Sequence, residues 1–288
     1  MHYSKPALTY EQQVVLLAHR GLVCSDLGRE VDWLWRIGYY RLSAYFIPFR
    51  APGTDDFKPG TTLDQIVDLY KFDGNLRLLV MQAMDRIEIA VRGVVTYHLA
   101  HELGVFGYTD SVNFHPGYDH ADLMRKLAAE ERRSSELFVA HFRSKYTSEP
   151  YLPIWVATEL MSFGMLSKMY GNVRKSTRKR IAKEFAQPES VFVSWLHSLA
   201  AIRNVCAHHS ILWNKQLRLK PELPGAWKAQ IDNRRFYVIA IMVQTLLLKV
   251  SPESKWKERL KEHFNEYPGV DLIAMGFPAD WQTRAPWI

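Results

Sequence analysis

The sequence has few of the features that would place it in a common class of protein. Its 288 residues include only two cysteines, Cys24 and Cys206, too few for a disulfide framework, so we expect a reducing, cytoplasmic environment. The N-terminus lacks the apolar core of a signal peptide. The longest apolar run, 236–250, covers 15 residues and contains Gln244, which predicts a buried core helix and no membrane span.

Phosphate-binding loops and metal-ligand sets are also missing. The sequence has no Walker loop, no glycine-rich dinucleotide turn and no Gly-x-Ser-x-Gly motif. His98 and His101 are three residues apart, as are Cys206 and His209, but neither pair has the further carboxylates or cysteines that close a zinc site. We therefore expect no metal and no cofactor.

Strand signals are nearly absent and helix signals recur, which predicts an all-α fold, a helical bundle. We expect a small N-terminal helical subdomain over 1–55, a helical core over 56–266 and a C-terminal tail packed on the core over 267–288. The segment 26–38 fits the second half of a helix-turn-helix, but a subdomain that only packs is the favoured interpretation. The predicted helices cover about 9–19, a segment around 31–35, 61–104, 119–147, 153–170, 176–186, 189–209, 228–250 and 252–265.

The sequence does contain an excess of basic charge. It has 37 Lys and Arg against 30 Asp and Glu, with a pI near 9.3, which favours an anionic partner such as nucleic acid. The basic residues are densest just before the predicted helix 189–209. Such a run can be an ordinary solvated face, but we favour contact with a nucleic-acid backbone. The predicted RNA-binding residues are Lys168, Arg174, Lys175, Arg178, Lys179, Arg180 and Lys183.

The stretch from Arg203 to His209 carries the residue types that can cut RNA without a metal. Upstream apolar residues at three- to four-residue spacing place it on a helix with one buried face. At about 100° per residue, His209 falls within the apolar stripe, so we expect it to be packed. His197, Asn204 and His208 gather on the opposite side, which marks His208 as the working histidine.

Arg203 lies roughly 140° around the helix from His208, too far for both side chains to hold one phosphate. A second helix must therefore complete the site. Ala200, Ala201 and Ala207 lie between them and would permit close approach. A two-fold pairing of identical helices would bring Arg203 of one chain near His208 of the other.

Arginine and histidine can also occur at this spacing by chance. Arg92 and His98 form such a pair, but Glu88 lies four residues before Arg92 and predicts an ordinary helix ion pair, so we interpret Arg92 and His98 as structural. The Arg203–His208 motif could itself serve packing alone. Substitution of His208 would then change only stability.

The motif resembles the signature of Abi-like abortive-infection proteins, the AbiD/AbiF group, a branch of the HEPN superfamily. Further segments agree with this family along nearly the whole chain. They are Ile37–Ser43, Phe72–Asp73 with Leu76–Leu79, Arg86–Glu88, Ser162–Gly164 with Leu166–Ser167 and Tyr170, Arg203–Ser210 with Leu212–Asn214, and Gly276–Pro278.

This resemblance implies an all-helical HEPN fold, a homodimer with a composite site and metal-independent ribonuclease activity. The catalytic positions would be Arg203 and His208, with Asn204 as the polar residue that often follows the arginine; we add His197 and His209 as supporting residues. An arginine commonly stands in the family where this chain has Ile211. The resemblance also suggests restraint by a small non-coding RNA.

These residues suit intramolecular transesterification. Histidine changes protonation state near neutral pH, so His208 could take the ribose 2′-OH proton or protonate the leaving 5′-oxygen. Arg203 would hold the phosphate and stabilise its developing charge. DNA lacks the 2′-OH and should not be a substrate. The alternative is a non-catalytic dimer that binds structured RNA and uses the motif as a phosphate clamp.

Overall fold

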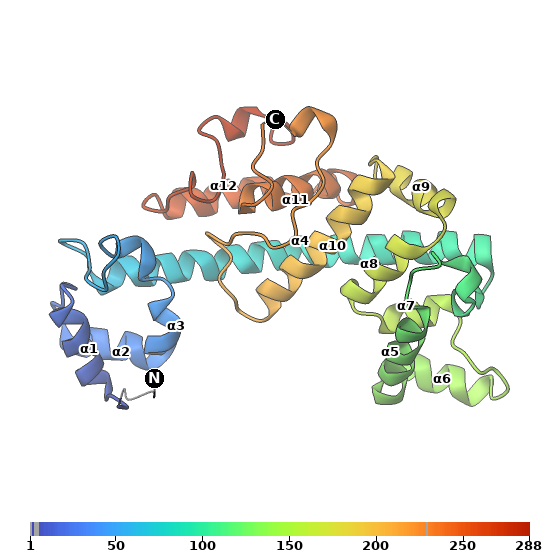
Figure 1. Ribbon diagram of the computed structural model, residues 1–288, viewed down its shortest axis with the longest axis horizontal. Coiled ribbons are helices and arrows are strands. Elements are labelled where there is room, and N and C mark those ends of the chain that lie inside the picture. Colours follow the sequence, from blue (N-terminus) through green and yellow to red (C-terminus); the bar gives the residue numbers. More distant parts are fainter. Residues whose placement is uncertain (1, 3–5, 229) are drawn as a thin grey trace. The chain divides into compact units, whose positions relative to one another are not determined.

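The chain folds as an assembly of helices, as the sequence predicts. A computed structural model describes residue 2, residues 6–228 and residues 230–288. Within these ranges it contains twelve α-helices, five short 3-10 helices and only isolated β-bridges (Figure 1). The α-helices are α1 Tyr10–His19, α2 Leu27–Ile37, α3 Tyr39–Ser43, α4 Leu63–Leu103, α5 His120–Arg133, α6 Leu137–Lys145, α7 Ile154–Leu160, α8 Phe163–Asn172, α9 Lys175–Glu184, α10 Glu189–Ala207, α11 Phe236–Val250 and α12 Trp256–Glu266.

The first of two compact units combines residues 1–76 with 261–270. Helix α1 begins with the predicted capping box, in which the Thr9 hydroxyl accepts from the Gln12 backbone and the Gln12 side chain accepts from Thr9. The early part of α4 joins this unit, because Tyr45 donates to the buried Asp73 carboxylate at 2.7 Å. The end of α12 joins it too, since His263 stacks on Phe72.

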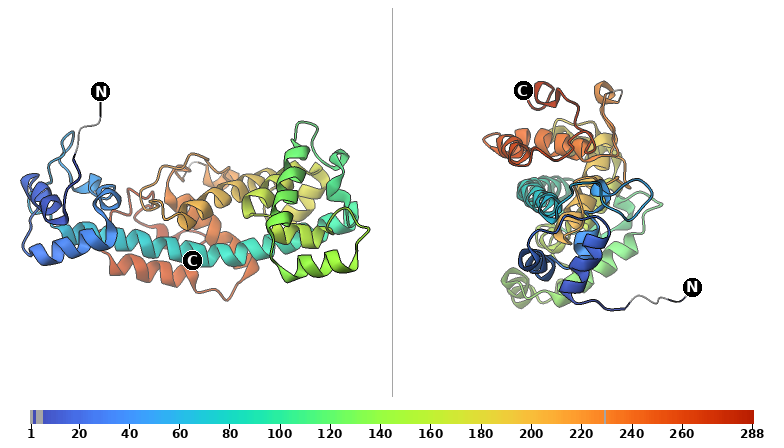
Figure 2. Two further views of the ribbon diagram at one scale, coloured as in Figure 1. Left: turned by 90° about the horizontal axis from the view of Figure 1, so that it is seen from below. Right: turned by 90° about the vertical axis from the view of Figure 1, so that its left-hand side faces the viewer.

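The second unit combines residues 77–260 with 271–288. The units therefore divide at other places than the expected 55/56 and 266/267, because the start of α4 packs with the N-terminal segment and the end of α12 packs on that start of α4. Helix α4 is continuous through Leu63–Leu103, as predicted, and can be followed in Figure 2. In the second unit α8 and α10 pack together, and α9 packs against α10.

Two predicted helices are each broken into two. The expected helix 119–147 stops at Arg133, where Ser134 turns to extended backbone and accepts a bond from the Glu136 amide. The expected helix 153–170 stops at Leu160 because Met161 is extended and Ser162 begins α8 as its N-cap, accepting from the Met165 amide.

The apolar run 236–250 forms the core helix that its length predicts. Helix α11 begins at Phe236, later than the expected residue 228, and most of its side chains are buried. Helix α12 likewise begins at Trp256, not at 252. Among the described residues, no helix combines the length and apolarity needed to cross a bilayer.

Candidate functional site

Helix α10 carries the Arg/His motif on a well-anchored support. Its buried stripe includes Trp195, Leu199, Ile202 and Cys206, which confirms the predicted core face. The Trp195 indole donates to the Glu222 backbone oxygen at 2.8 Å. The helix is thus fixed by its apolar side.

The last turn of α10 ends within the motif. His208 is the C-cap, and His209 has a φ of 54°, in the left-handed region. The His209 amide donates to the Cys206 oxygen and the Ser210 amide to the Val205 oxygen, a Schellman motif in which glycine usually takes the left-handed position. The predicted packing of His209 is therefore wrong: the helical angle no longer applies beyond Ala207, and His209 is exposed.

The outer face of α10 gathers several of the predicted residues. His197 and Asn204 line one cavity, together with Lys168 of α8. His197, Asn204 and His208 are exposed, and their side chains form no hydrogen bond with a described residue. These three side chains are therefore not packed in the core and are accessible to a ligand.

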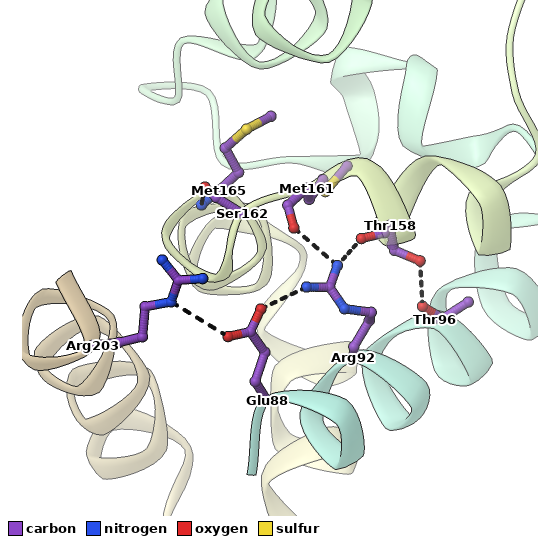
Figure 3. Close-up of polar contacts among 8 residues, drawn as sticks. All are labelled: Glu88, Arg92, Thr96, Thr158, Met161, Ser162, Met165 and Arg203. Carbon is purple, nitrogen blue, oxygen red and sulfur yellow. Dashed lines mark hydrogen bonds and ion pairs between the residues drawn. The ribbon is translucent and has the colours of Figure 1, made fainter. Parts of the chain in front are cut away.

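Arg203 points to a different neighbour from Asn204. Its Nε lies 4.0 Å from Oε2 of Glu88 on α4 (Figure 3), and its side chain is 40% exposed. The other oxygen of Glu88 pairs with Arg92 at 2.8 Å. One carboxylate thus lies between two guanidinium groups, of which Arg203 is the more loosely held and the more exposed.

Arg92 is structural, as predicted. Besides the ion pair with Glu88, its guanidinium donates to the backbone oxygens of Thr158 and Met161, at the end of α7 (Figure 3). The Thr158 oxygen also accepts from the Met161 amide, and Arg92 adds a side-chain donor to both carbonyls, which stabilises the break between α7 and α8. His98 lies near Glu102 and Glu184, at 3.9 and 3.6 Å.

Two residues of α4 that the sequence did not connect with the motif contact it in the structure. Glu88 contacts Arg203, and the buried Arg77 donates to the Ser210 oxygen at 3.4 Å, just beyond the two histidines. Arg77 and Glu88 are 11 residues apart, three helical turns, so they share one face of α4. That spacing of charged residues on an apolar face was the signal available in the sequence.

The basic run is only partly available to a ligand. Arg178 pairs with Glu189 at 2.8 Å and is 22% exposed, and Arg180 pairs with Glu102 at 2.5 Å. Helices α10 and α4 thus bring carboxylates to this run. The remaining five, Lys168, Arg174, Lys175, Lys179 and Lys183, are exposed and form no ion pair with a described residue.

The structure does not bring the basic run and the motif together. Helix α9 leads directly into the first turn of α10, whereas Arg203 lies 14 residues after Glu189, about 21 Å along the helix. Only Lys168 shares a cavity with residues of the motif face. No three His, Cys, Asp or Glu side chains of the described ranges cluster in a way that could hold a metal ion.

Comparison with known proteins agrees with the resemblance. The sequence model of the Abi-like protein family matches residues 32–214, more than half of the chain. The match ends at Asn214, so it contains the whole Arg203–Ser210 stretch and also Arg77, Glu88 and Ser162. No curated protein and no solved structure matches the chain. The chain belongs to the Abi-like protein family, a membership that supports a role in abortive-infection defence.

Proposed function

We propose that this protein is a metal-independent endoribonuclease of HEPN type that acts in abortive infection. The observation that carries the proposal is the end of α10, where the Asn204 and His208 side chains are exposed and form no hydrogen bond with a described residue, and Arg203 is held only loosely by Glu88. A guanidinium and an imidazole on one accessible helix end are the groups that phosphate chemistry needs.

The reaction is attack of the ribose 2′-oxygen on the adjacent phosphorus. The new 2′-O–P bond forms as the P–O5′ bond breaks, which leaves a 2′,3′-cyclic phosphate and a 5′-hydroxyl. His208 accepts the 2′-OH proton or donates a proton to O5′, a contribution of about 10²–10⁴ in rate. Arg203 binds the phosphate oxygens, and Asn204 orients the phosphate or the imidazole.

The site is composite in this proposal. Arg203 is directed to Glu88, while His208 caps the end of the helix, so the two groups of one chain face different surroundings. A second copy related by a two-fold axis near the outer face of α10 would bring Arg203 of one chain to His208 of the other. A homodimer then contains two equivalent sites.

The decisive assay compares wild type with His208→Ala on total tRNA and mRNA in EDTA. We expect cleavage by the wild type, ends that carry cyclic or 3′-phosphate, and loss of cleavage in the variant. The matched control is His141→Ala, which removes an exposed histidine of α6. Strict dependence on Mg²⁺ or Mn²⁺, or full activity of His208→Ala, would refute the mechanism.

The alternative is a dimer that binds structured RNA without cutting it. The exposed lysines of α9 favour RNA binding whether or not cleavage occurs. In that case His208→Ala would weaken RNA affinity, and no cleavage would be detected in any variant.

An active ribonuclease endangers its own host, so we propose that a small structured non-coding RNA restrains it. Protein purified from its native host should carry this RNA. Release at raised salt would agree with binding through phosphates. Protein that is isolated free of RNA, with unrestrained activity, would contradict the proposal.

A further inference from the structure

A cavity of about 490 Å³ lies against the outer face of α10, within the second unit. This volume falls in the usual range for small-ligand sites, about 300–1,000 Å³. Helix α10 contributes His197, Ala200, Ala201 and Asn204, and α8 and its N-cap contribute Ser162, Gly164, Met165 and Lys168. The remaining wall consists of Tyr118, Asp122, Leu123, Lys126, Glu130 and Leu219.

The cavity wall holds one cation that is not paired with an acidic side chain of the described residues. The exposed Lys168 forms no ion pair with a described residue, so its ammonium group is available to an anion. The two carboxylates in the wall are already neutralised. Asp122 accepts hydrogen bonds from Lys126, at 2.5 Å, and from Arg125, and these bonds lower the pKa of its carboxyl group. Glu130 forms an ion pair with Arg133 at 2.6 Å.

The rest of the wall offers surfaces for a heterocycle. Tyr118 is half-buried, packs on Phe114 with ring centroids 5.5 Å apart, and has its pKa raised to about 12 by burial, so its hydroxyl stays a donor. Leu123 and Met165 supply apolar contact. Aromatic and apolar surface beside amide and imidazole groups is how proteins bind unstacked bases.

The cavity begins at the motif. Asn204 directly follows Arg203, and His197 lies seven residues earlier on the same face, about 10 Å along α10. The cavity and the Arg203 guanidinium therefore lie on the same turn of α10, within reach of neighbouring nucleotides of one strand. The cation of Lys168 and the base-binding surface would then meet the next nucleotide.

We propose that this cavity is a subsite for one nucleotide of single-stranded RNA beside the scissile phosphate, with Lys168 on its phosphate and Tyr118, His197 and Asn204 around its base. This inference rests on the proposed function for the position of the scissile bond. Occupancy of the subsite would determine where the enzyme cuts, because only direct contact with a base carries sequence information.

The test uses short fluorescent RNA oligonucleotides with 2′-O-methyl riboses, which cannot be cleaved. Their binding to the full chain is followed by anisotropy over a range of salt concentrations. Lys168→Ala should weaken binding several-fold and reduce the slope of log affinity against log salt by about 0.7. Lys249→Ala, which removes an exposed lysine of α11, is the matched control and should change neither value.

A second measurement locates the base. RNA carrying 4-thiouridine is cross-linked to the protein, and the modified peptides are sequenced. We expect cross-links in the peptides of Tyr118, Met165 or His197, and their loss in His197→Leu. This readout does not depend on the effect of Lys168→Ala on affinity.

The outcomes separate the subsite from catalysis. Reduced affinity of Lys168→Ala with cross-links in the cavity supports the subsite even if no RNA is cleaved, and only the proposed function then fails. Equal affinity of Lys168→Ala and Lys249→Ala, with cross-links elsewhere, overturns the subsite even if His208 proves catalytic. Binding of free nucleoside monophosphates but not of the oligonucleotide overturns it too.

Discussion

The two ends of α10 differ in how far their basic side chains are paired with internal carboxylates. At its first turn, the basic run of α9 contains many cations, but Arg178 and Arg180 are paired with Glu189 and Glu102. At its last turn the motif has fewer charges, yet Arg203 is partly exposed and the His208 imidazole has no hydrogen-bond partner among the described residues. The number of basic residues in a stretch of sequence therefore overstates how many cations are available to a ligand. Internal ion pairs determine how many remain.

Subunit mixing should give the largest effect, and it tests the motif end. Arg203→Ala and His208→Ala should each lose about 10²–10⁴ of the cleavage rate. If the composite site is correct, an equimolar mixture that exchanges subunits should recover roughly a quarter of wild-type activity, because half of the dimers are mixed and each keeps one intact site. Labelled-RNA cleavage measures this recovery, and subunit exchange is verified separately by fluorescence. Exchange without recovery would contradict the shared site.

The stability of variants should separate the two kinds of cation within α9. Arg178→Ala removes the ion pair with Glu189 and the bond to the Gly171 oxygen, and should lower the free energy of unfolding by about 2 kcal/mol. Lys179→Ala, at the next and exposed position, should change it by less than about 0.5 kcal/mol. Urea unfolding with an unchanged m-value is the measurement. Equal effects would mean that the Arg178 contacts contribute no net stability.

RNA affinity should show the reverse order. Lys175, Lys179 and Lys183 lie at four-residue spacing on one exposed face of α9. Changing all three to glutamine should reduce the salt slope by about 0.7–0.9 for each lost phosphate contact. The control changes three scattered exposed lysines, Lys145, Lys249 and Lys255, to glutamine and alters the net charge equally. If both triple variants lose the same slope, the α9 face is an ordinary solvated surface.

Local sequence signals predicted the helices that depend on local contacts. The Thr9 capping box, the length of α4 and the burial of Cys206 follow from residues within a few positions. The break between α7 and α8 could not be foreseen, because it is stabilised by Arg92, about 70 positions away, whose guanidinium donates to the Thr158 and Met161 carbonyls.

The candidate site shows the same division. The helical angle correctly placed His197 and Asn204 on one face, since both lie inside α10. It failed for His209, which follows the helix end, and it could not reveal that Glu88 lies beside Arg203 or Glu102 beside Arg180. Those pairs depend on how distant helices pack, so the sequence predicts which residues are charged but not which charges remain available.

The smallest predicted effect concerns the ends of α9 and α10, which close in the same way. In α9, Ala186 has a φ of 52° and forms the equivalent Schellman motif, with its amide bonded to the Lys183 oxygen and the Gln187 amide to the Ala182 oxygen. Left-handed backbone costs a residue other than glycine about 1 kcal/mol or more. Ala186→Gly and His209→Gly should therefore each raise the free energy of unfolding, by up to about 1 kcal/mol.

The two variants should differ in activity, which is what makes the pair informative. Ala186 has no functional group, so Ala186→Gly should leave cleavage unchanged. His209 occupies a left-handed backbone conformation that glycine would adopt at lower free-energy cost, and strained residues of this kind are found most often at functional sites. If the imidazole beside His208 supports catalysis, His209→Gly should lower the cleavage rate several-fold while unfolding becomes harder, a combination that damage to the fold cannot produce. A stabilised His209→Gly variant with wild-type cleavage would show that His209 has no part in the reaction.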